Sequence, residues 1–435
     1  MKIEFPGRSR LEDSADIDLS DLPRFAPAKR SRTQPTVADV ADATEAALAS
    51  VPLDHLPSGA EIALTAGSRG IHDVPTVLAT IASHLEDRGY HPFVMPAMGS
   101  HGGATADGQL ETLASLGMTE DSIGCEFRSS MAVEEVGEDI DGRPIFAAED
   151  ALTADAIILV NRVKAHTDYE GPYESGLAKM AVVGLGKHRG AEVMHNAALA
   201  RGFQEVIPER ARVLLKQTPV IGGIAILENA NERAAEIVGL PVDEIMTEEP
   251  ALLERSKSLL PTLPVDELDL LMLQEMGKDI SGTGMDTNIL GRQLFHGQPE
   301  PAGPDITRVY VRSLTAVSHG NALGMGLADF IHENVIEDID FGDTYVNIAT
   351  SGEPVRAKVP FVVPADSTVL TLTASTTGVK SPEELRIAMI ENTLEPDDLY
   401  VSEPVAEVLK THPDVAVGDL KTLEIDGNGE IQYSF

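Results

Sequence analysis

The chain has 435 residues, of which 43% are hydrophobic and 4% aromatic, and its 33 basic and 70 acidic side chains give a formal net charge of −37. Such a field repels nucleic acid and anionic lipid, which argues against binding to either. The single cysteine, Cys125, excludes internal disulfides, thiolate zinc sites and a cysteine-held iron–sulfur cluster, and the length suggests two domains.

Apolar runs alternate with amphipathic helical patterns along the first 280 residues. Helices are predicted over 36–51, 74–89 and 105–117. Short apolar strands are predicted at 61–67, 91–99, 154–163, 219–230 and 268–277. This alternation is typical of a mostly parallel sheet that is covered by helices on both faces.

A stretch rich in proline and acidic residues, 241–267, is interpreted as a seam before a second α/β unit. The strands predicted in that unit are RVYVRSL (308–314), TYVNIAT (344–350), KVPFVV (358–363) and TVLTLTA (368–374). Near the C-terminus, Asn428-Gly429 indicates a hairpin.

The predicted fold class is therefore α/β with two lobes, each a mostly parallel sheet flanked by helices. The predicted divisions are an N-terminal domain at 1–265, a C-terminal domain at 266–400 and a last segment at 401–435 that packs back on the first domain. The functional site is expected in the cleft between the lobes, because ligands gather at the carboxyl ends of strands in open α/β sheets.

Basic, imidazole and amide side chains follow these strand ends. They are Arg69 after the first strand, His101 in a Gly-Ser-His-Gly-Gly turn after the second, Lys164, His166 and Lys179 after the third, and Gln274 and Lys278 after 268–273. Each has a structural alternative: a helix start for Arg69, a plain tight turn for His101 and a buried core histidine for His166. Their joint occurrence favours one ligand site.

The segment ESGLAKMAVVGLGKHRGAEVMH (174–195) does not contain a standard nucleotide loop. A phosphate-binding P-loop requires G-x-x-x-x-G-K-[ST], but Gly186-Lys187 is followed by His188, and Ala181 stands in the place of the first glycine. No G-x-G-x-x-G follows the first strand either.

The order of an Arg turn, a Gly-Ser-His turn and a His-loop-Ser-Gly-x-x-Lys stretch with a further histidine resembles the nickel-dependent lactate racemase family. The motifs cover about the first 280 residues. In that family a lysine is covalently joined to a nickel-pincer nucleotide, a pyridinium mononucleotide whose two sulfur arms and ring carbon hold nickel. The resemblance implies that Lys179 is the tether, beside Ser175 and Gly176 in the cofactor site, and that His195 is the metal ligand.

The resemblance further implies a racemase or epimerase of a 2-hydroxy acid that works by hydride abstraction and return through a keto acid. His101 and His166 would be the acid/base pair, and Arg69 would bind the substrate carboxylate. Gln274 and Lys278 would supply polar groups from near the second domain. These residue types suit the chemistry, since imidazole exchanges protons near neutral pH and guanidinium binds carboxylate through a bidentate fork.

Two features depart from the family. Lactate racemases carry an Asp-His-Thr-Arg turn, whereas this chain reads Ala66-Gly67-Ser68-Arg69, and the loop that follows His166 is longer than expected. These differences favour a larger, differently polar hydroxy acid over lactate itself.

Alternative functions are a metal- or lysine-dependent lyase acting on an acidic substrate, with Lys179 as a Schiff-base or cationic group, and a non-catalytic nucleotide- or ligand-binding protein. In a competing interpretation of the segment, Lys179 pairs with Glu170 or Glu174, and Lys187 or His188 binds the ligand.

The expected partners are a small 2-hydroxy acid and the proteins that synthesise the cofactor, so a host without those proteins should yield apo protein. The acidic N-terminus and the lack of a long apolar run predict a cytoplasmic protein that does not enter a membrane.

Overall fold

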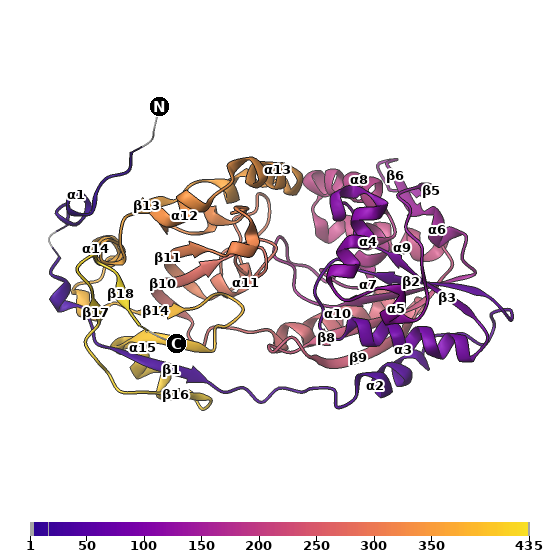
Figure 1. Cartoon of the computed structure of the whole chain (residues 1–435), viewed down its shortest axis with the longest axis horizontal. Helices are drawn as coiled ribbons and strands as arrows, with labels where there is room; N and C mark the ends of the chain where they lie inside the picture. The colour runs from indigo at the N-terminus through magenta and orange to yellow at the C-terminus, as the bar shows by residue number, and fades with distance from the viewer. Residues whose placement is uncertain (1–3, 16, 434–435) are drawn as a thin grey trace. The chain divides into compact units, whose positions relative to one another are not determined.

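The computed structural model describes residues 4–15 and 17–433, which form two compact units (Figure 1). Unit 1 comprises the described residues up to Thr33 and those from Pro261 onward, and unit 2 comprises Gln34–Leu260. The chain therefore begins in unit 1, forms unit 2 and returns.

The residues that form unit 1 differ from those of either predicted domain, because the first strand of the chain pairs with strands near its C-terminus. In Figure 1 the indigo strand β1 (Phe25–Arg30) lies beside the yellow C-terminal part of the chain. It runs antiparallel to both β15 (Asp398–Ser402) and β16 (Val415–Val417). These pairings place β1 in unit 1 together with the described residues from 401 onward.

Unit 2 is built on a sheet in which the described residues form six strands, in the order β4-β3-β2-β7-β8-β9. The strands are β2 (Glu61–Ala66), β3 (His91–Pro96), β4 (Glu126–Phe127), β7 (Ala156–Arg162), β8 (Val220–Glu228) and β9 (Ala234–Pro241). Only β9 runs antiparallel to its neighbour. From β2 the chain builds the sheet to one side and later, from β7, to the other, so the strand order reverses between β2 and β7.

Helices cover both faces of this sheet. On one face, alternate strand residues such as Ile62, Val94 and Ile158 form a core with residues of α2 (Val40–Leu48), α3 (Val74–Asp87) and α4 (Ala106–Ser115). Elsewhere α10 (Val242–Leu259) packs against β8, and α7 (Leu177–Lys179) packs against β7, β8 and α9 (Phe203–Gln217). The other elements are α5 (Glu120–Ile123), α6 (Glu149–Leu152), α8 (Lys187–Arg201), the 3₁₀ turn η2 (Gly102–Ala104), the π-helical turn η3 (Met180–Gly184) and a hairpin of β5 (Val133–Glu138) and β6 (Pro144–Ala148).

Unit 1 contains a sheet with eight strands among the described residues, in the order β13-β12-β11-β10-β14-β15-β1-β16. The strands not yet given are β10 (Glu267–Met276), β11 (Asp305–Leu314), β12 (Phe330–His332), β13 (Phe361–Val363) and β14 (Ile387–Ile390). These five run parallel, and β15, β1 and β16 continue the sheet in antiparallel fashion.

The unit 1 sheet is also covered on both faces. One core contains side chains of α11 (Thr287–Leu290), α12 (Glu333–Asp338) and α15 (Glu403–Leu409), and the other contains those of α14 (Asp366–Thr376) and β18 (Ile431–Gln432). The remaining elements are α1 (Arg8–Glu12), α13 (Phe341–Ser351), β17 (Glu424–Ile425) and the 3₁₀ turns η1 (Leu19–Asp21), η4 (Ala316–Ser318), η5 (Met325–Leu327), η6 (Pro354–Ala357) and η7 (Pro382–Glu384). The predicted class, mostly parallel sheets flanked by helices, is confirmed, as is the hairpin at Asn428-Gly429, which joins β17 to β18.

Two strands predicted in unit 1 are wrong, because 344–350 lies within α13 and 368–374 lies within α14. Helix α13 begins where the Asp340 carboxylate accepts the N–H groups of Gly342 (2.8 Å) and Asp343 (3.1 Å), a capping arrangement that favours a helix over a strand. In α14 the Thr371 hydroxyl donates to the carbonyl four residues earlier (2.9 Å), so its β-branched, polar side chains are accommodated within the helix. The predicted seam at 241–267 contains helix α10, which the sequence patterns missed.

None of the helices formed by the described residues combines the length and the apolar character required to cross a bilayer.

Candidate functional site

The sheet order of unit 2 brings several of the predicted site residues to one edge. Strands β3, β2 and β7 are adjacent and parallel, so the segments after their carboxyl ends meet at the point where the strand order reverses, the usual ligand position in such sheets. Arg69 follows β2, His101 follows β3, and the loop to Lys179 follows β7. The Ser68 hydroxyl is hydrogen-bonded to Nδ1 of His101, which ties the first two segments together.

The loop between β7 and α7 is closed at its base by two backbone hydrogen bonds between Lys164 and Ser175, 2.9 and 3.1 Å long. Its interior is organised by Glu174, whose side chain is 1% exposed. The Glu174 carboxylate accepts the N–H groups of His166 (2.7 Å) and Gly171 (3.1 Å) and forms an ion pair with Lys257 (2.9 Å). Glu174 therefore supports the loop and forms its ion pair with Lys257, not with Lys179.

The hydrogen bonds of His166 define which of its ring nitrogens carries a proton. Its Nδ1 accepts the Asp168 backbone N–H at 3.0 Å, so the neutral ring has its proton on Nε2. An Asp168 carboxylate oxygen lies 3.8 Å from the same Nδ1. A proton on Nδ1 would face that carboxylate and would leave Nε2 free to accept a proton from a substrate. Asp168 can therefore stabilise either tautomer of His166, the first through its backbone N–H and the second through its carboxylate.

Burial lowers the pKa of His166 well below its usual range, and the nearby Lys179 ammonium lowers it further, against the opposing effect of Asp168. Arg69 and His195 also lower the pKa of His166, which places these cations and imidazoles within electrostatic reach of one another. His166 is consequently neutral at physiological pH.

A row of aromatic rings connects His166, predicted for catalysis, with His195, predicted for metal binding. The His166 and Tyr169 ring centroids are 4.5 Å apart, and Tyr169 stacks on Phe203 at the same distance. His195 contacts Phe203 edge-on with centroids 6.1 Å apart. Two aromatic rings therefore separate His166 from His195 and fix their spacing.

Lys179 lies beside this row, with Nζ 5.7 Å from the Tyr169 ring centroid. The side chain is half-buried and makes no hydrogen bond or ion pair with any of the residues that the structure describes. Burial lowers the pKa of Lys179 to about 8, with Arg69 acting in the same direction and Asp168 opposing it. About a tenth of this amine is therefore unprotonated and nucleophilic at pH 7, far more than of a lysine with the ordinary pKa near 10.5.

His195 and Arg69 are exposed to solvent, although many protein atoms surround them. Burial lowers the pKa of His195, with a further contribution from the Lys179 ammonium. Burial also lowers the pKa of Arg69, and the neighbouring Arg162 guanidinium adds to that effect. Water reaches both groups and limits these shifts, so Arg69 stays cationic and His195 is neutral at physiological pH.

The remaining predicted residues have structural partners of their own. Ser175 belongs to the bridge with Lys164. Gln274 and Lys278 belong to unit 1: Gln274 accepts a hydrogen bond from Arg312 (2.7 Å), and Lys278 Nζ donates to Asn347 (3.1 Å) and to the Gly282 carbonyl. Their participation in a site with residues of unit 2 stays a prediction.

Lys187, the competing ligand-binding lysine, is fully buried. Its Nζ donates to the Pro96 carbonyl at 2.6 Å, at the end of β3. This contact gives Lys187 a role in supporting the segment that leads to His101.

Residues that the sequence patterns did not single out also shape the site. Arg162, at the end of β7, adds positive charge beside Arg69 and is paired with Glu228. Glu249 of α10 is 1% exposed and accepts the Ala178 N–H at 2.9 Å, one residue before Lys179. Burial raises the pKa of Glu249 to about 7, against the effect of the backbone N–H groups that it accepts.

The raised pKa of Glu249 predicts a pH-dependent stability. Because the folded state binds the Glu249 proton more tightly than the unfolded state, stability falls as pH rises from about 4.5 to 7, by up to about 3 kcal/mol. Glu249→Gln lacks this titration, so it should be more stable than the wild type at pH 8, with the difference shrinking toward pH 5.5. Urea unfolding followed by circular dichroism measures the free energy of unfolding at each pH.

Glu248→Gln, at an exposed neighbouring position on α10, should leave the wild-type pH dependence unchanged. Equal curves of stability against pH for Glu249→Gln and wild type would contradict the assignment.

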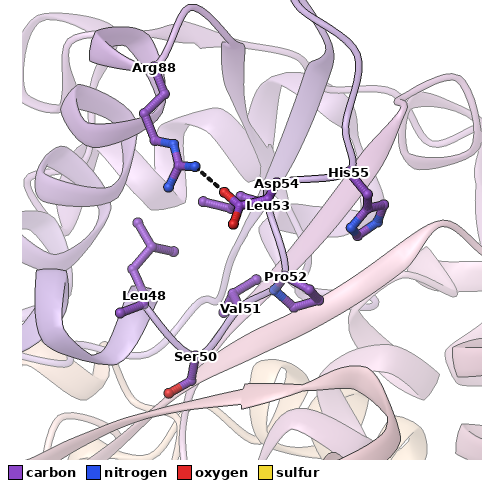
Figure 2. Close-up of a pocket in the computed structure, with 9 residues that line it drawn as sticks. Leu48, Ser50, Val51, Pro52, Leu53, Asp54, His55 and Arg88 are labelled. Atoms are coloured by element: carbon purple, nitrogen blue, oxygen red, sulfur yellow. Dashed lines mark hydrogen bonds and ion pairs between the residues drawn. The ribbon is translucent and has the colours of Figure 1, made fainter.

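A separate hollow of about 490 Å³ lies at the surface of unit 2 (Figure 2). It is lined by residues 48–55, between α2 and β2, and by Arg88 after α3, with the Arg88–Asp54 ion pair at its side. None of the predicted site residues lines it.

Within the described residues, no group of three or more His, Cys, Asp or Glu side chains is arranged to hold a metal ion.

No protein-family model matches the sequence, and no curated protein matches it. Among solved structures, the chain is similar to one described as the lactate racemase apoprotein from Thermoanaerobacterium thermosaccharolyticum. The two share 12% sequence identity with a TM-score of 0.47, over 86% of this chain and 97% of that one.

Proposed function

We propose that this protein is a racemase or epimerase of a 2-hydroxy acid that carries a nickel-pincer nucleotide on Lys179. The observation that carries the proposal is the state of Lys179. It is a half-buried amine with no hydrogen bond or ion pair to the described residues, 5.7 Å from the centroid of the Tyr169 ring that stacks on His166, and burial lowers its pKa to about 8. A structural lysine would be expected to have a partner, as Lys187 has.

The residues of unit 2 fit such a cofactor. The nucleotide brings three donors of its own to the nickel, so the protein needs to supply one imidazole, and a cluster of several metal-binding side chains is unnecessary. His195 is exposed, neutral and within electrostatic reach of Lys179, which suits a nickel ligand. When bound, the nucleotide would accept and return a hydride at the substrate α-carbon.

The protein would bind the substrate through its carboxylate. Arg69 is exposed at the end of β2 and has a guanidinium fork that matches a carboxylate. Lys179 adds positive charge nearby, whereas the charge of Arg162 is balanced by its ion pair with Glu228. Arg69 and Lys179 would attract an anion to this edge of the sheet in a chain whose formal net charge is −37.

His101 and His166 would move the hydroxyl proton. His101 is exposed and bonded through Nδ1 to Ser68, whose hydroxyl both donates and accepts, so Nε2 of His101 can be a donor or an acceptor. His166 has its proton on Nε2 in the described arrangement and donates from there, and it becomes a base when Nδ1 is protonated toward Asp168. One residue for each enantiomer is then available.

A second candidate function is supported by the same amine. A half-buried lysine with a pKa of about 8 is suited to form a Schiff base with a carbonyl substrate, as in a lyase that uses no nickel. Reduction with borohydride in the presence of a keto acid would trap that species on Lys179 with the mass of the substrate alone.

The proposal is tested by producing the protein in a host that contains the cofactor-synthesis proteins. The expected result is a heavy adduct on the tryptic peptide that contains Lys179, together with bound nickel. His195→Ala should retain the adduct and lose most of the nickel, whereas His188→Ala, an exposed control in the same helix, should retain both. An isomerase-active sample in which Lys179 is unmodified would overturn the proposal.

A further inference from the structure

Helix α10 contacts the segment 163–178 at four points along its length. The Tyr173 hydroxyl bonds to the Met246 carbonyl, Glu249 accepts the Ala178 N–H, the Ser256 hydroxyl donates to the Val163 carbonyl at 2.7 Å, and Lys257 pairs with Glu174 at 2.9 Å. Both ends of the loop that holds His166 are therefore attached to α10.

The contact made by Glu249 lies closest to Lys179. Its Oε2 accepts the Ala178 N–H at 2.9 Å, and the Leu177 N–H lies close enough to lower the pKa of the carboxylate. On the other side, Asn161 of β7 donates its side-chain N–H to the Gly176 carbonyl at 2.9 Å. The backbone at the start of α7 is thus held from two directions by side chains of two different elements.

Gly176 faces the Glu249 carboxylate directly. A Cβ atom at this position would lie 2.4 Å from Oε1 and 2.6 Å from the carboxyl carbon of Glu249, closer than such atoms approach. Oε1 is buried and has no hydrogen-bond partner among the described residues. Glycine at position 176 therefore leaves the space that the Glu249 carboxylate occupies, and this explanation does not depend on the ligand of the site.

Lys179 is the last residue of α7, three positions after Gly176, and the π-helical turn η3 follows it. The direction in which its side chain leaves the backbone depends on the first turn of α7, and that turn has no side-chain cap of its own. The buried carboxylate of Glu249, a residue of α10, acts as the cap instead by accepting the N–H of Ala178 in this first turn.

We propose that Glu249 is a positioning residue that fixes the start of α7 and thereby holds the Lys179 amine in its half-buried position beside the Tyr169 ring. The inference rests on the proposed function only in taking Lys179 as the reactive group of the site. A purely structural Glu249 would affect the stability of unit 2 and leave the reactivity of Lys179 unchanged.

The experiment measures the reactivity of Lys179 in the full-length protein without cofactor. The protein is acetylated briefly with acetic anhydride at a series of pH values from 6.5 to 10.5, and modification of the Lys179 peptide is quantified by mass spectrometry, with the Lys410 peptide as internal reference. Glu249→Ala, Glu249→Gln and the exposed control Glu248→Ala are compared with wild type.

In the wild type, the acetylation of Lys179 should rise with a midpoint near pH 8. Glu249→Gln keeps an acceptor oxygen for the Ala178 N–H and should keep this midpoint, as should Glu248→Ala. Glu249→Ala should shift the midpoint upward by about 1 unit or more and slow acetylation at pH 7 by about tenfold, because an amine released into water regains its ordinary pKa. Gly176→Ala, which forces the Glu249 carboxylate away, should reproduce that shift.

An unchanged midpoint in both Glu249→Ala and Gly176→Ala would overturn the proposal. If Glu249→Ala does not fold, the decision falls to Gly176→Ala and to Glu249→Asp, whose shorter side chain withdraws the carboxylate and should also raise the midpoint. Failure of the proposed function is distinguishable, because it appears as a missing adduct in wild-type protein from the cofactor-producing host and does not alter these midpoints.

Discussion

Lys179→Met, produced in a host that synthesises the cofactor, is expected to carry no adduct and to isomerise its hydroxy acid at least on the order of 10³-fold more slowly than wild type. Methionine has a similar length and apolar stem but no amine, so the substitution removes the nucleophile and preserves the packing against Tyr169. The measurements are the mass of the 174–195 region after digestion and the initial rate of conversion of one enantiomer or epimer into the other.

Lys187→Met is the matched control for this variant. Lys187 lies eight positions later, is buried and donates to the Pro96 carbonyl, so its loss should lower the free energy of unfolding by about 1.5–3 kcal/mol and leave the adduct in place. An adduct that persists in Lys179→Met and disappears in Lys187→Met would instead support the competing interpretation, in which Lys187 is the ligand-binding lysine.

His166→Asn is expected to reduce isomerisation by about 10²–10⁴-fold, the contribution typical of a positioned acid or base. For a pair of enantiomers the equilibrium constant is 1, so kcat/KM must fall equally from both directions even though His166 serves only one face of the substrate. Initial rates starting from each enantiomer test this equality. Asparagine retains a polar side chain of similar size, which limits the structural change.

His188→Asn is the control, since this exposed histidine has no role in the proposed proton transfer and should keep wild-type rates. Asp168→Asn provides a second comparison. It removes the carboxylate that would stabilise a proton on Nδ1 of His166, so it should impair isomerisation while the ring remains in place. Wild-type rates in both His166→Asn and Asp168→Asn would exclude His166 from the proton-transfer step.

The central strands of both sheets could be predicted because their signal is local. Strands such as β2, β7 and β10 are continuous apolar runs that end in polar or glycine-containing turns, and periodicity is sufficient to find them. The segments 344–350 and 368–374 also carry the β-branched residues of strands. Their helical structure depends on the Asp340 cap and on hydroxyl-to-carbonyl bonds within α14, and these outweigh the intrinsic preference.

The candidate site could be predicted in its residue types but not in its supports. Arg69, His101 and His166 follow strand ends, and the sheet order brings those ends together. Glu249 stands in the acidic stretch TEEPALLE (247–254) and is indistinguishable there from its exposed neighbours. Only the packing of α10 against the start of α7 reveals that it is buried and bonded to the Lys179 segment, because that contact joins residues 71 positions apart.

The pairing of β1 with β15 and β16 also has a consequence for synthesis on the ribosome. Lys29 of β1 and its partner Asp398 are 369 positions apart, so at 5–20 residues per second the first strand emerges roughly 20–75 s before the strand that will cover it. During that interval unit 2 can fold, while β1 exposes unpaired backbone groups that could join other nascent chains. Pro27 has no backbone N–H to donate to such a pairing, and Lys29 and Arg30 add charge. The sequence FAPAKR therefore limits aggregation of β1 before its partner strands are synthesised.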